Sequence, residues 1–160
     1  MIGRRLPDLG PRGEGWFLIQ ILLFTAIALA GSIGPAWDGV ARFAGLAAGA
    51  GLIVCGGLFS FRGVLDLRAN LTPFPRPLPG AQLVETGSYR LARHPIYGGL
   101  ILGAFGWGIA TASPIALGLA GVLVVFFDLK SRREEIWLAE QFDGYAAYRG
   151  RTRRLLPWVY

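Results

Sequence analysis

GSYRLARHPIYGG, residues 87–99, separates one apolar half of this sequence from the other. Its polar members include the single histidine of the chain, two arginines and two tyrosines: His94, Arg90, Arg93, Tyr89 and Tyr97. The proline that follows the histidine suits the first turn of a helix, so these polar side chains are expected directly before a helix. Polar groups at the edge of an apolar segment place chemistry at a membrane boundary, and we expect the functional site here.

The composition of the chain is that of a membrane protein. Of the 160 residues, 53% are hydrophobic and 24 are glycine, and the mean hydropathy is +0.47. These values are high for a soluble chain of this length, so a small soluble protein with an apolar core is the weaker interpretation. The length predicts one domain, residues 1–160.

The N-terminal tail carries arginines ahead of a long apolar run, a pattern that superficially resembles a signal peptide. No clear small-x-small cleavage site precedes a soluble domain, and further apolar runs follow, so we interpret this run as a retained first span. The single cysteine, Cys55, rules out an intramolecular disulfide framework and a multi-cysteine metal site, and we expect no metal site.

Four apolar segments predict an all-α, polytopic membrane fold. The expected transmembrane helices are residues 16–37, 40–61, 96–111 and 114–129. The first two are long enough to cross roughly 30 Å of hydrocarbon at about 1.5 Å per residue. The last two are shorter, so tilting, extension into the flanks and a hairpin that barely crosses all remain open.

Residues 62–95 form a predicted cytoplasmic loop, because they hold many charges and a proline-rich run, residues 73–79. Proline fixes an extended path and removes backbone donors. The run is typical of a PxxP signalling ligand, but a loop that lies over a membrane-embedded site explains it as well. We favour the loop over a site.

Residues 131–160 are expected to form an amphipathic interfacial helix followed by a tail. The helix is predicted from Ser131 to about Arg149, and Ser131 has capping-box spacing with Glu134. Its apolar positions at helical spacing are Ile136, Ala139, Phe142 and Tyr145. A helix that continues unbroken from the fourth span is an equal alternative. The basic and aromatic tail suits a headgroup interface.

Charge predicts the orientation. Of the 16 Lys and Arg residues, all but Arg42 lie in the N-terminal tail, in the 62–93 loop or after Phe127. With four spans these segments share one side of the membrane, and the positive-inside rule makes that side cytoplasmic. We therefore expect an inner-membrane protein with both termini in the cytoplasm. The net charge of +6 indicates anionic lipid headgroups rather than nucleic acid as a partner, because the arginines border the spans.

Two polar clusters are candidate site residues. A lone histidine beside a membrane is more often structural, but His94 has Arg93 and Tyr97 beside it, which donate hydrogen bonds where water is scarce. The second cluster is the adjacent carboxylates Glu134 and Glu135, just past the fourth span. Such a pair is commonly a solvated helix face, yet a cationic ligand at a membrane needs fixed negative charge.

In their order and spacing these motifs resemble a known superfamily. The motifs are Gly87-Ser88-Tyr89-Arg90, Arg93-His94-Pro95-Ile96-Tyr97-Gly98-Gly99, Glu134-Glu135-Ile136-Trp137-Leu138, Phe142, Tyr145, Tyr148 and Arg153-Arg154-Leu155-Leu156-Pro157. The pattern resembles the isoprenylcysteine carboxyl methyltransferases and phospholipid methyltransferases, which are integral membrane enzymes. It covers about residues 71–157, and this chain has Ser88 where the family pattern usually has proline.

The resemblance implies that a cytoplasm-facing pocket holds S-adenosylmethionine. The implied cofactor-binding residues are Tyr89, Arg93, His94, Tyr97, Gly106, Gly108, Glu134, Glu135 and Tyr148. The implied catalytic residues are Glu135, His94 and Arg153. Gly106 and Gly108 correspond to a Gly-x-Gly motif of related enzymes, although helix packing explains such glycines about as often.

The chemistry of S-adenosylmethionine agrees with this assignment. Its carboxylate suits basic donors, its two cationic groups suit the acidic pair, and its adenosine suits aromatic walls such as those of Trp107 and Tyr145. Arginine from residues 149–154 would orient a carboxylate acceptor, whereas Glu135 or His94 would take the proton of an amine or thiol. We expect Glu135→Gln to weaken cofactor binding or methyl transfer and to leave the protein folded.

The predicted function is methyl transfer to a lipophilic acceptor at the cytoplasmic membrane face. The acceptor classes are a prenylated thiol or carboxylate, a phospholipid amine and other hydrophobic small molecules. One alternative is a membrane reductase that uses NADPH and is related to sterol reductases. Another is a non-catalytic lipid-binding membrane protein. The sequence leaves open the acceptor atom and the oligomeric state.

Overall fold

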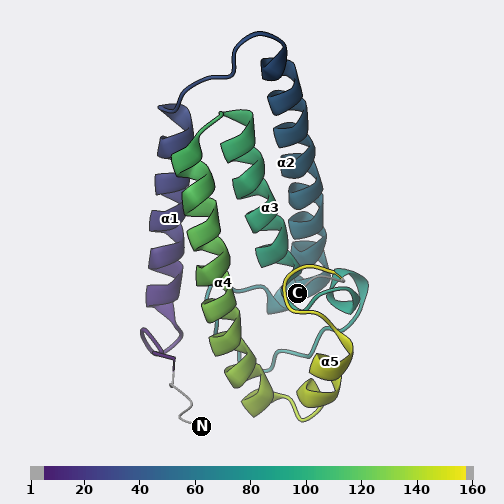
Figure 1. Ribbon diagram of the computed structural model, residues 1–160. Helices are drawn as coiled ribbons and strands as arrows, with labels where there is room; N and C mark the ends of the chain where they lie inside the picture. The colour runs from purple at the N-terminus through teal and green to yellow at the C-terminus, as the bar shows by residue number, and fades with distance from the viewer. Residues whose placement is uncertain (1–5, 158–160) are drawn as a thin grey trace.

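The computed structural model describes residues 6–157, and this part of the chain is helical without a β-strand (Figure 1). Its helices are α1 (Glu14–Ser32), α2 (Gly39–Leu67), α3 (Pro95–Ala110), α4 (Pro114–Gln141) and α5 (Tyr145–Arg151), with short 3-10 turns η1 (Arg68–Asn70) and η2 (Gly87–Arg90). The four long helices stand side by side, with α4 between α1 and α3, and α3 between α4 and α2.

Three of these helices, α1, α2 and α4, are long and apolar enough to cross a membrane. The fourth, α3, is also apolar but has 16 residues. At about 1.5 Å per residue it reaches roughly 24 Å, which is less than the hydrocarbon thickness of about 30 Å. The predicted all-α, polytopic membrane fold is confirmed.

The helix ends differ from the predicted spans. α1 ends at Ser32 instead of continuing to Trp37, because Gly34 and Pro35 disfavour helix there. α2 continues to Leu67, beyond the expected end at Phe61. Arg62, which was expected to open the loop, therefore belongs to the last two turns of α2.

The separate helix expected from Ser131 to Arg149 does not form. α4 runs without a break to Gln141, and the Ser131 hydroxyl donates to the Asp128 carbonyl at 3.0 Å, so Ser131 lies inside the helix and does not cap one. From Val122 to Phe142 the sequence has no glycine or proline to interrupt the helix. The chain turns near Gly144, and α5 follows.

Paired glycines bring α2 and α3 close together. A methyl group on Gly106 would lie 2.6 Å from the carbonyl oxygen of Gly49. Nearer the start of α3, Gly99 packs against the carbonyl oxygen of Gly56 in the same way. The Ser60 hydroxyl of α2 donates a hydrogen bond to the Ile96 carbonyl of α3 at 2.9 Å. Small residues of this kind allow membrane helices to pack with their backbones nearly in contact.

The buried core lies between α1, α3 and α4. Its fully buried apolar members are Trp16, Ile27, Ile101, Ala104, Ala120, Leu123, Phe126, Phe127 and Leu155. The outward faces carry exposed apolar side chains, among them Leu18, Leu22, Phe43, Leu58, Phe61 and Val125. Exposed leucine and phenylalanine on these helices match a lipid surrounding.

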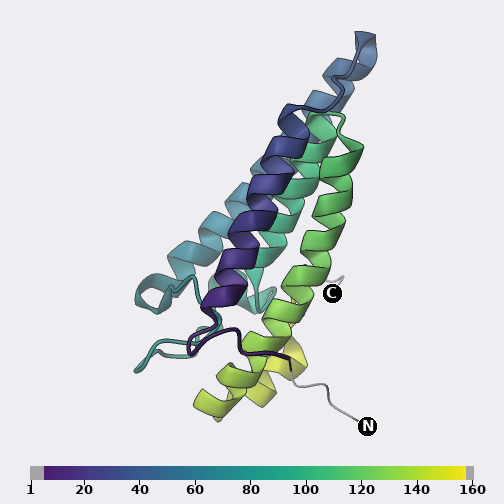
Figure 2. The ribbon, with the colours of Figure 1, turned by 90° about the vertical axis from the view of Figure 1, so that its left-hand side faces the viewer.

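The N-terminal segment, the loop between α2 and α3 and the C-terminal segment gather at one end of the bundle, opposite the connections from α1 to α2 and from α3 to α4 (Figure 2). There the N-terminal segment holds the proline-rich run: the Arg76 guanidinium donates to the Pro11 carbonyl at 3.0 Å, and the Arg12 guanidinium lies 4.3 Å from the centre of the Phe74 ring. The N-terminal segment and the proline-rich run therefore pack together over this end of the helices.

Candidate active site

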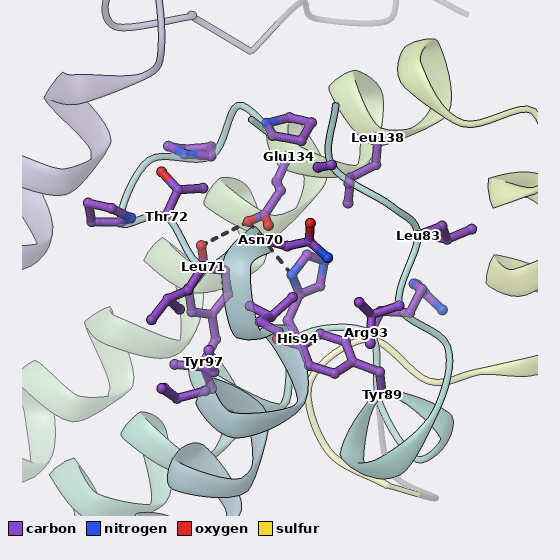
Figure 3. Close-up of a pocket in the computed structure, with 18 of the residues that line it drawn as sticks. Asn70, Leu71, Thr72, Leu83, Tyr89, Arg93, His94, Tyr97, Glu134 and Leu138 are labelled. Atoms are coloured by element: carbon purple, nitrogen blue, oxygen red, sulfur yellow. Dashed lines mark hydrogen bonds and ion pairs between the residues drawn. The ribbon is translucent and has the colours of Figure 1, made fainter. Parts of the chain in front are cut away.

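A cavity of about 320 Å³ lies at this end of the bundle. Its walls come from the end of α2, the loop between α2 and α3, the start of α3, the last turns of α4, and α5 (Figure 3). The proline-rich run contributes Pro73, Pro75 and Pro77 to these walls, so the loop lies against the cavity. The volume is at the lower end of the range for small-molecule sites, about 300–1,000 Å³.

The segment before α3 is fixed from both sides. The Asp66 carboxylate accepts hydrogen bonds from the Ser88 N–H at 2.7 Å and from the Ser88 hydroxyl at 2.8 Å. Gly87 has φ of +62° and packs against that carboxylate, a place where a side chain would not fit. On the other side, the N–H of His94 donates to the Arg154 carbonyl at 2.9 Å. The histidine side chain is thereby directed into the cavity at the start of α3.

Glu134 is the carboxylate of the cavity. Figure 3 shows its side chain reaching from α4 to a point between Tyr97 and His94. It accepts a hydrogen bond from the Tyr97 hydroxyl at 2.8 Å, and its Oε2 lies 3.7 Å from His94 Nδ1. The side chain is 23% exposed. A fixed, oriented negative charge therefore faces the open space.

The imidazole of His94 stacks on the Tyr97 ring, with ring centres 5.4 Å apart and planes within 1°. Its other nitrogen, Nε2, is buried and has no hydrogen-bond partner of acceptable geometry among residues 6–157, although Glu135 Oε1 lies 3.4 Å away. Nε2 therefore lies beside the carboxylate behind the cavity, whereas Nδ1 lies beside Glu134 in the cavity wall.

Glu135 lies behind the cavity and is not among its described lining residues. It is 4% exposed and accepts a hydrogen bond from Arg93 Nε at 2.8 Å. The guanidiniums of Arg149 and Arg154 approach the same carboxylate at 3.6 and 3.4 Å. This carboxylate joins α4 to the segment before α3 and to the C-terminal tail, so its role in the described structure is to hold the site together.

Three further tyrosines, Tyr89, Tyr145 and Tyr148, contribute to the lining of the cavity. The Tyr148 hydroxyl donates a hydrogen bond to the Tyr89 carbonyl at 2.6 Å. The Tyr145 hydroxyl is buried and has no hydrogen-bond partner in the described part of the chain. Burial raises the pKa of the Tyr89, Tyr145 and Tyr148 phenols above their usual range. All three therefore stay protonated and neutral at physiological pH, and the hydroxyl of Tyr148 is already used within the protein.

The structure brings together most of the candidate residues. Those that line the cavity are Tyr89, Arg93, His94, Tyr97, Glu134 and Tyr148. Two of the three guanidinium nitrogens of Arg93 are engaged, because its Nε binds Glu135 and its Nη1 binds the backbone carbonyls of Arg149 and Thr152. The charge of Arg93 is therefore already paired within the protein, and its role toward a ligand carboxylate stays a prediction.

Four candidate residues lie elsewhere. The side chain of Arg153 is exposed, and its carbonyl accepts the Arg93 N–H at 2.8 Å in a short parallel bridge. Gly106 packs on α2, and a methyl group on Gly108 would lie 2.7 Å from Leu117. Trp107, expected as an aromatic wall, packs against Gly31 of α1. The structure therefore supports helix packing for the Gly-x-Gly pattern.

Gly106→Ala is expected to destabilise the protein without a specific effect on ligand affinity. Its methyl group would collide with Gly49 and Ile53, and overpacking of this kind costs about 1–3 kcal/mol. Gly103→Ala is the matched control, because nothing lies within 4 Å of a methyl group at that position of the same helix. Thermal unfolding in detergent checks this, and equal melting temperatures for the two variants would contradict the packing role.

Sequence reasoning missed several polar lining residues: Gln20, Asn70, Thr72, Gln82 and Lys130. Lys130 lies one helical turn before Glu134, so it had a usable signal, since residues four apart share a helix face. The others come from α1 and from the covering loop, and no local pattern links them to the motif around His94.

Comparisons with known proteins agree with this architecture. The family model described as phospholipid methyltransferase matches residues 44–144, which include α3, most of α2 and all of α4. The chain is also 38% identical over 79 residues to the cobalt-zinc-cadmium resistance protein CzcN of Cupriavidus metallidurans; the match takes in 47% of this chain and 35% of that protein. The chain is thus an integral membrane protein that belongs to the phospholipid methyltransferase family, within the isoprenylcysteine and phospholipid methyltransferase superfamily.

Proposed function

We propose that the protein transfers a methyl group from S-adenosylmethionine to a lipophilic acceptor at the cytoplasmic face of the inner membrane. The observation that carries this proposal is the cavity in which Glu134, His94 and Tyr97 converge at the ends of membrane helices. The family of the chain supports the reaction class, and the chemistry of the cavity supports the donor.

The residues present fit S-adenosylmethionine. The donor has a cationic ammonium and sulfonium, for which the Glu134 carboxylate is the available counter-charge on the cavity wall. Its adenosine suits the faces of Tyr89 and Tyr148, which are buried and neutral. When bound, it would supply an activated methyl group whose transfer removes the sulfonium charge.

The chain contributes positioning, exclusion of water and a proton acceptor. The proline-rich loop closes one side of the cavity, and a reaction that loses charge is helped when water is excluded. If the acceptor is an amine or a thiol, the imidazole of His94, which lines the cavity, can take its proton. Glu135 is unsuited to that task, since its oxygens are bound to Arg93 and its neighbours.

An apolar part of the same cavity supports a lipophilic acceptor. Val64, Leu67, Ile96 and Leu100 line it beside the polar group around Glu134. Val64 and Leu67 come from α2, one of the three helices long enough to cross a membrane. An acceptor with a hydrocarbon chain can therefore bury that chain against α2 and α3 and present its polar end to the donor.

The proposal is tested by transfer of tritiated methyl from labelled S-adenosylmethionine. Purified protein in nanodiscs is incubated with a lipid extract, and radioactivity is counted in the organic phase. We expect label in the organic phase with the wild-type protein and a loss of at least about 10-fold with Glu134→Gln. Equal counts with and without folded wild-type protein, across extracts from several growth conditions, would contradict the proposal.

A further inference from the structure

Lys130 stands apart from the other cations of the chain. It is the single lysine among the 16 Lys and Arg residues, and it is 1% exposed on the wall of the cavity. A lysine ammonium is a compact point charge with three donors, and burying it without a counter-charge is unfavourable. Its position therefore requires a physical explanation.

The groups in direct contact with the Lys130 ammonium are all neutral, and Glu134 acts on it only at longer range. Its Nζ donates to Gln20 Oε1 at 2.6 Å, lies 3.5 Å from the Pro73 carbonyl oxygen, and sits 5.1 Å from the centre of the Tyr97 ring. Within residues 6–157 no carboxylate lies within ion-pair distance of it. Glu134, one turn further along α4, is engaged by Tyr97 and His94.

The other cation of the cavity wall shows the contrast. Arg93 is neutralised by Glu135, and its remaining contacts are backbone carbonyls. Lys130 lacks such a carboxylate, and Gln20 holds it through its amide oxygen, which leaves the amide N–H₂ of Gln20 as a further donor. Positive charge and amide donors thus meet at one place on the wall.

We propose that Lys130 and Gln20 form an anion-binding subsite of the cavity. It takes the carboxylate or phosphate of the bound molecule, either the carboxylate of the methyl donor or an acidic group on the acceptor; the first source rests on the proposed function. Cβ atoms four residues apart on a helix are about 5–6 Å apart. Lys130 and Glu134 therefore present opposite charges at a spacing that suits an α-amino acid, with its carboxylate on one and its ammonium on the other.

Because the chain has one lysine, labelling with lysine carrying ¹⁵N at Nζ and ¹³C at Cε gives one side-chain signal for the subsite. The labelled protein is placed in phosphatidylcholine nanodiscs and titrated with S-adenosylhomocysteine, with its decarboxylated analogue, and with dodecyl phosphate. A shift with the homocysteine compound and none with its decarboxylated analogue assigns the donor carboxylate. A shift with dodecyl phosphate alone assigns the acceptor side. No shift with any bound probe overturns the subsite.

Variants provide the second measurement. Lys130→Met keeps most of the side-chain length and removes the charge. It is expected to weaken binding of whichever probe moves the lysine signal, S-adenosylhomocysteine or dodecyl phosphate, about 10-fold or more. Binding of the decarboxylated analogue is expected to stay unchanged. Arg42→Met is the matched control, because it removes an exposed cation near the start of α2. Wild-type affinity of folded Lys130→Met for every probe would overturn the proposal.

Gln20→Glu tests the same subsite if Lys130→Met does not fold. It gives Lys130 a carboxylate partner at the observed contact, so the anionic probe should bind about 10-fold more weakly and no longer move the lysine signal. Unchanged binding in this variant would also count against the subsite. If wild-type protein binds dodecyl phosphate at Lys130 but neither adenosyl compound, the proposed methyl donor fails and the subsite stands. If S-adenosylhomocysteine binds and no probe moves the Lys130 signal, the proposed methyl donor stands and the subsite fails.

Discussion

Glu135→Ala is expected to lower the thermal stability of the protein more than any other single change to its carboxylates. The substitution would leave Arg93, which is 8% exposed, without its counter-charge. Breaking a buried pair by removing one partner costs about 3–5 kcal/mol. The same change would release His94 and the C-terminal tail from α4, so we expect little folded protein after extraction. Circular dichroism during heating in detergent measures the effect.

Glu140→Ala is the matched control for this prediction. Glu140 is an exposed carboxylate on the same helix, so its loss should change stability by less than about 0.5 kcal/mol. Glu135→Gln should fall between the two, because the amide keeps the shape but loses the charge. If Glu135→Ala and Glu140→Ala have the same melting temperature and Glu135→Ala loses only ligand binding, Glu135 acts in the cavity and not behind it.

Glu134→Gln is expected to give the largest loss of ligand binding in a protein that stays folded. The carboxylate is partly exposed to the cavity and is held by the Tyr97 hydroxyl and His94. Hydrogen bonds to charged groups are worth about 1.5–3 kcal/mol, which corresponds to roughly 10- to 100-fold in affinity. Calorimetric titration with S-adenosylhomocysteine, whose ammonium would pair with this carboxylate, measures the loss.

Tyr97→Phe serves as the comparison for Glu134→Gln. It removes the hydroxyl that orients the carboxylate but leaves the charge that would contact the ligand, so we expect a smaller loss, about 5-fold. Unfolding curves of both variants should overlay that of the wild type within a few degrees. Full affinity in folded Glu134→Gln would remove this carboxylate from the ligand site.

Much of the site was predictable because it depends on local order along the chain. His94 and Tyr97 stand at the start of α3 and Glu134 near the end of α4, and a short turn joins the two helices. Two antiparallel helices with a short turn bring the start of the first beside the second, which places these residues together. The proline-rich loop was likewise expected over the site, since its charges and prolines exclude it from a span.

The separate roles of Glu134 and Glu135 were not predictable. Neighbouring helical residues point about 100° apart, so one of two adjacent carboxylates must face away from the ligand. Which one faces Arg93 depends on the rotation of α4, which tertiary packing sets and the sequence pattern does not. Gly106 was ambiguous for a related reason, because glycines that pack helices and glycines that approach a ligand have the same local sequence. Lys130 was overlooked because Gln20, its partner, is far away in the chain.

The central claim is that this cavity binds the methyl donor, and titration of the wild-type protein in nanodiscs tests it most directly. S-adenosylhomocysteine and NADPH are added separately and their binding heats are compared. We predict micromolar binding of S-adenosylhomocysteine, lost in His94→Ala, and no binding of NADPH. Binding of NADPH to folded protein that ignores S-adenosylhomocysteine would contradict the account and favour a reductase.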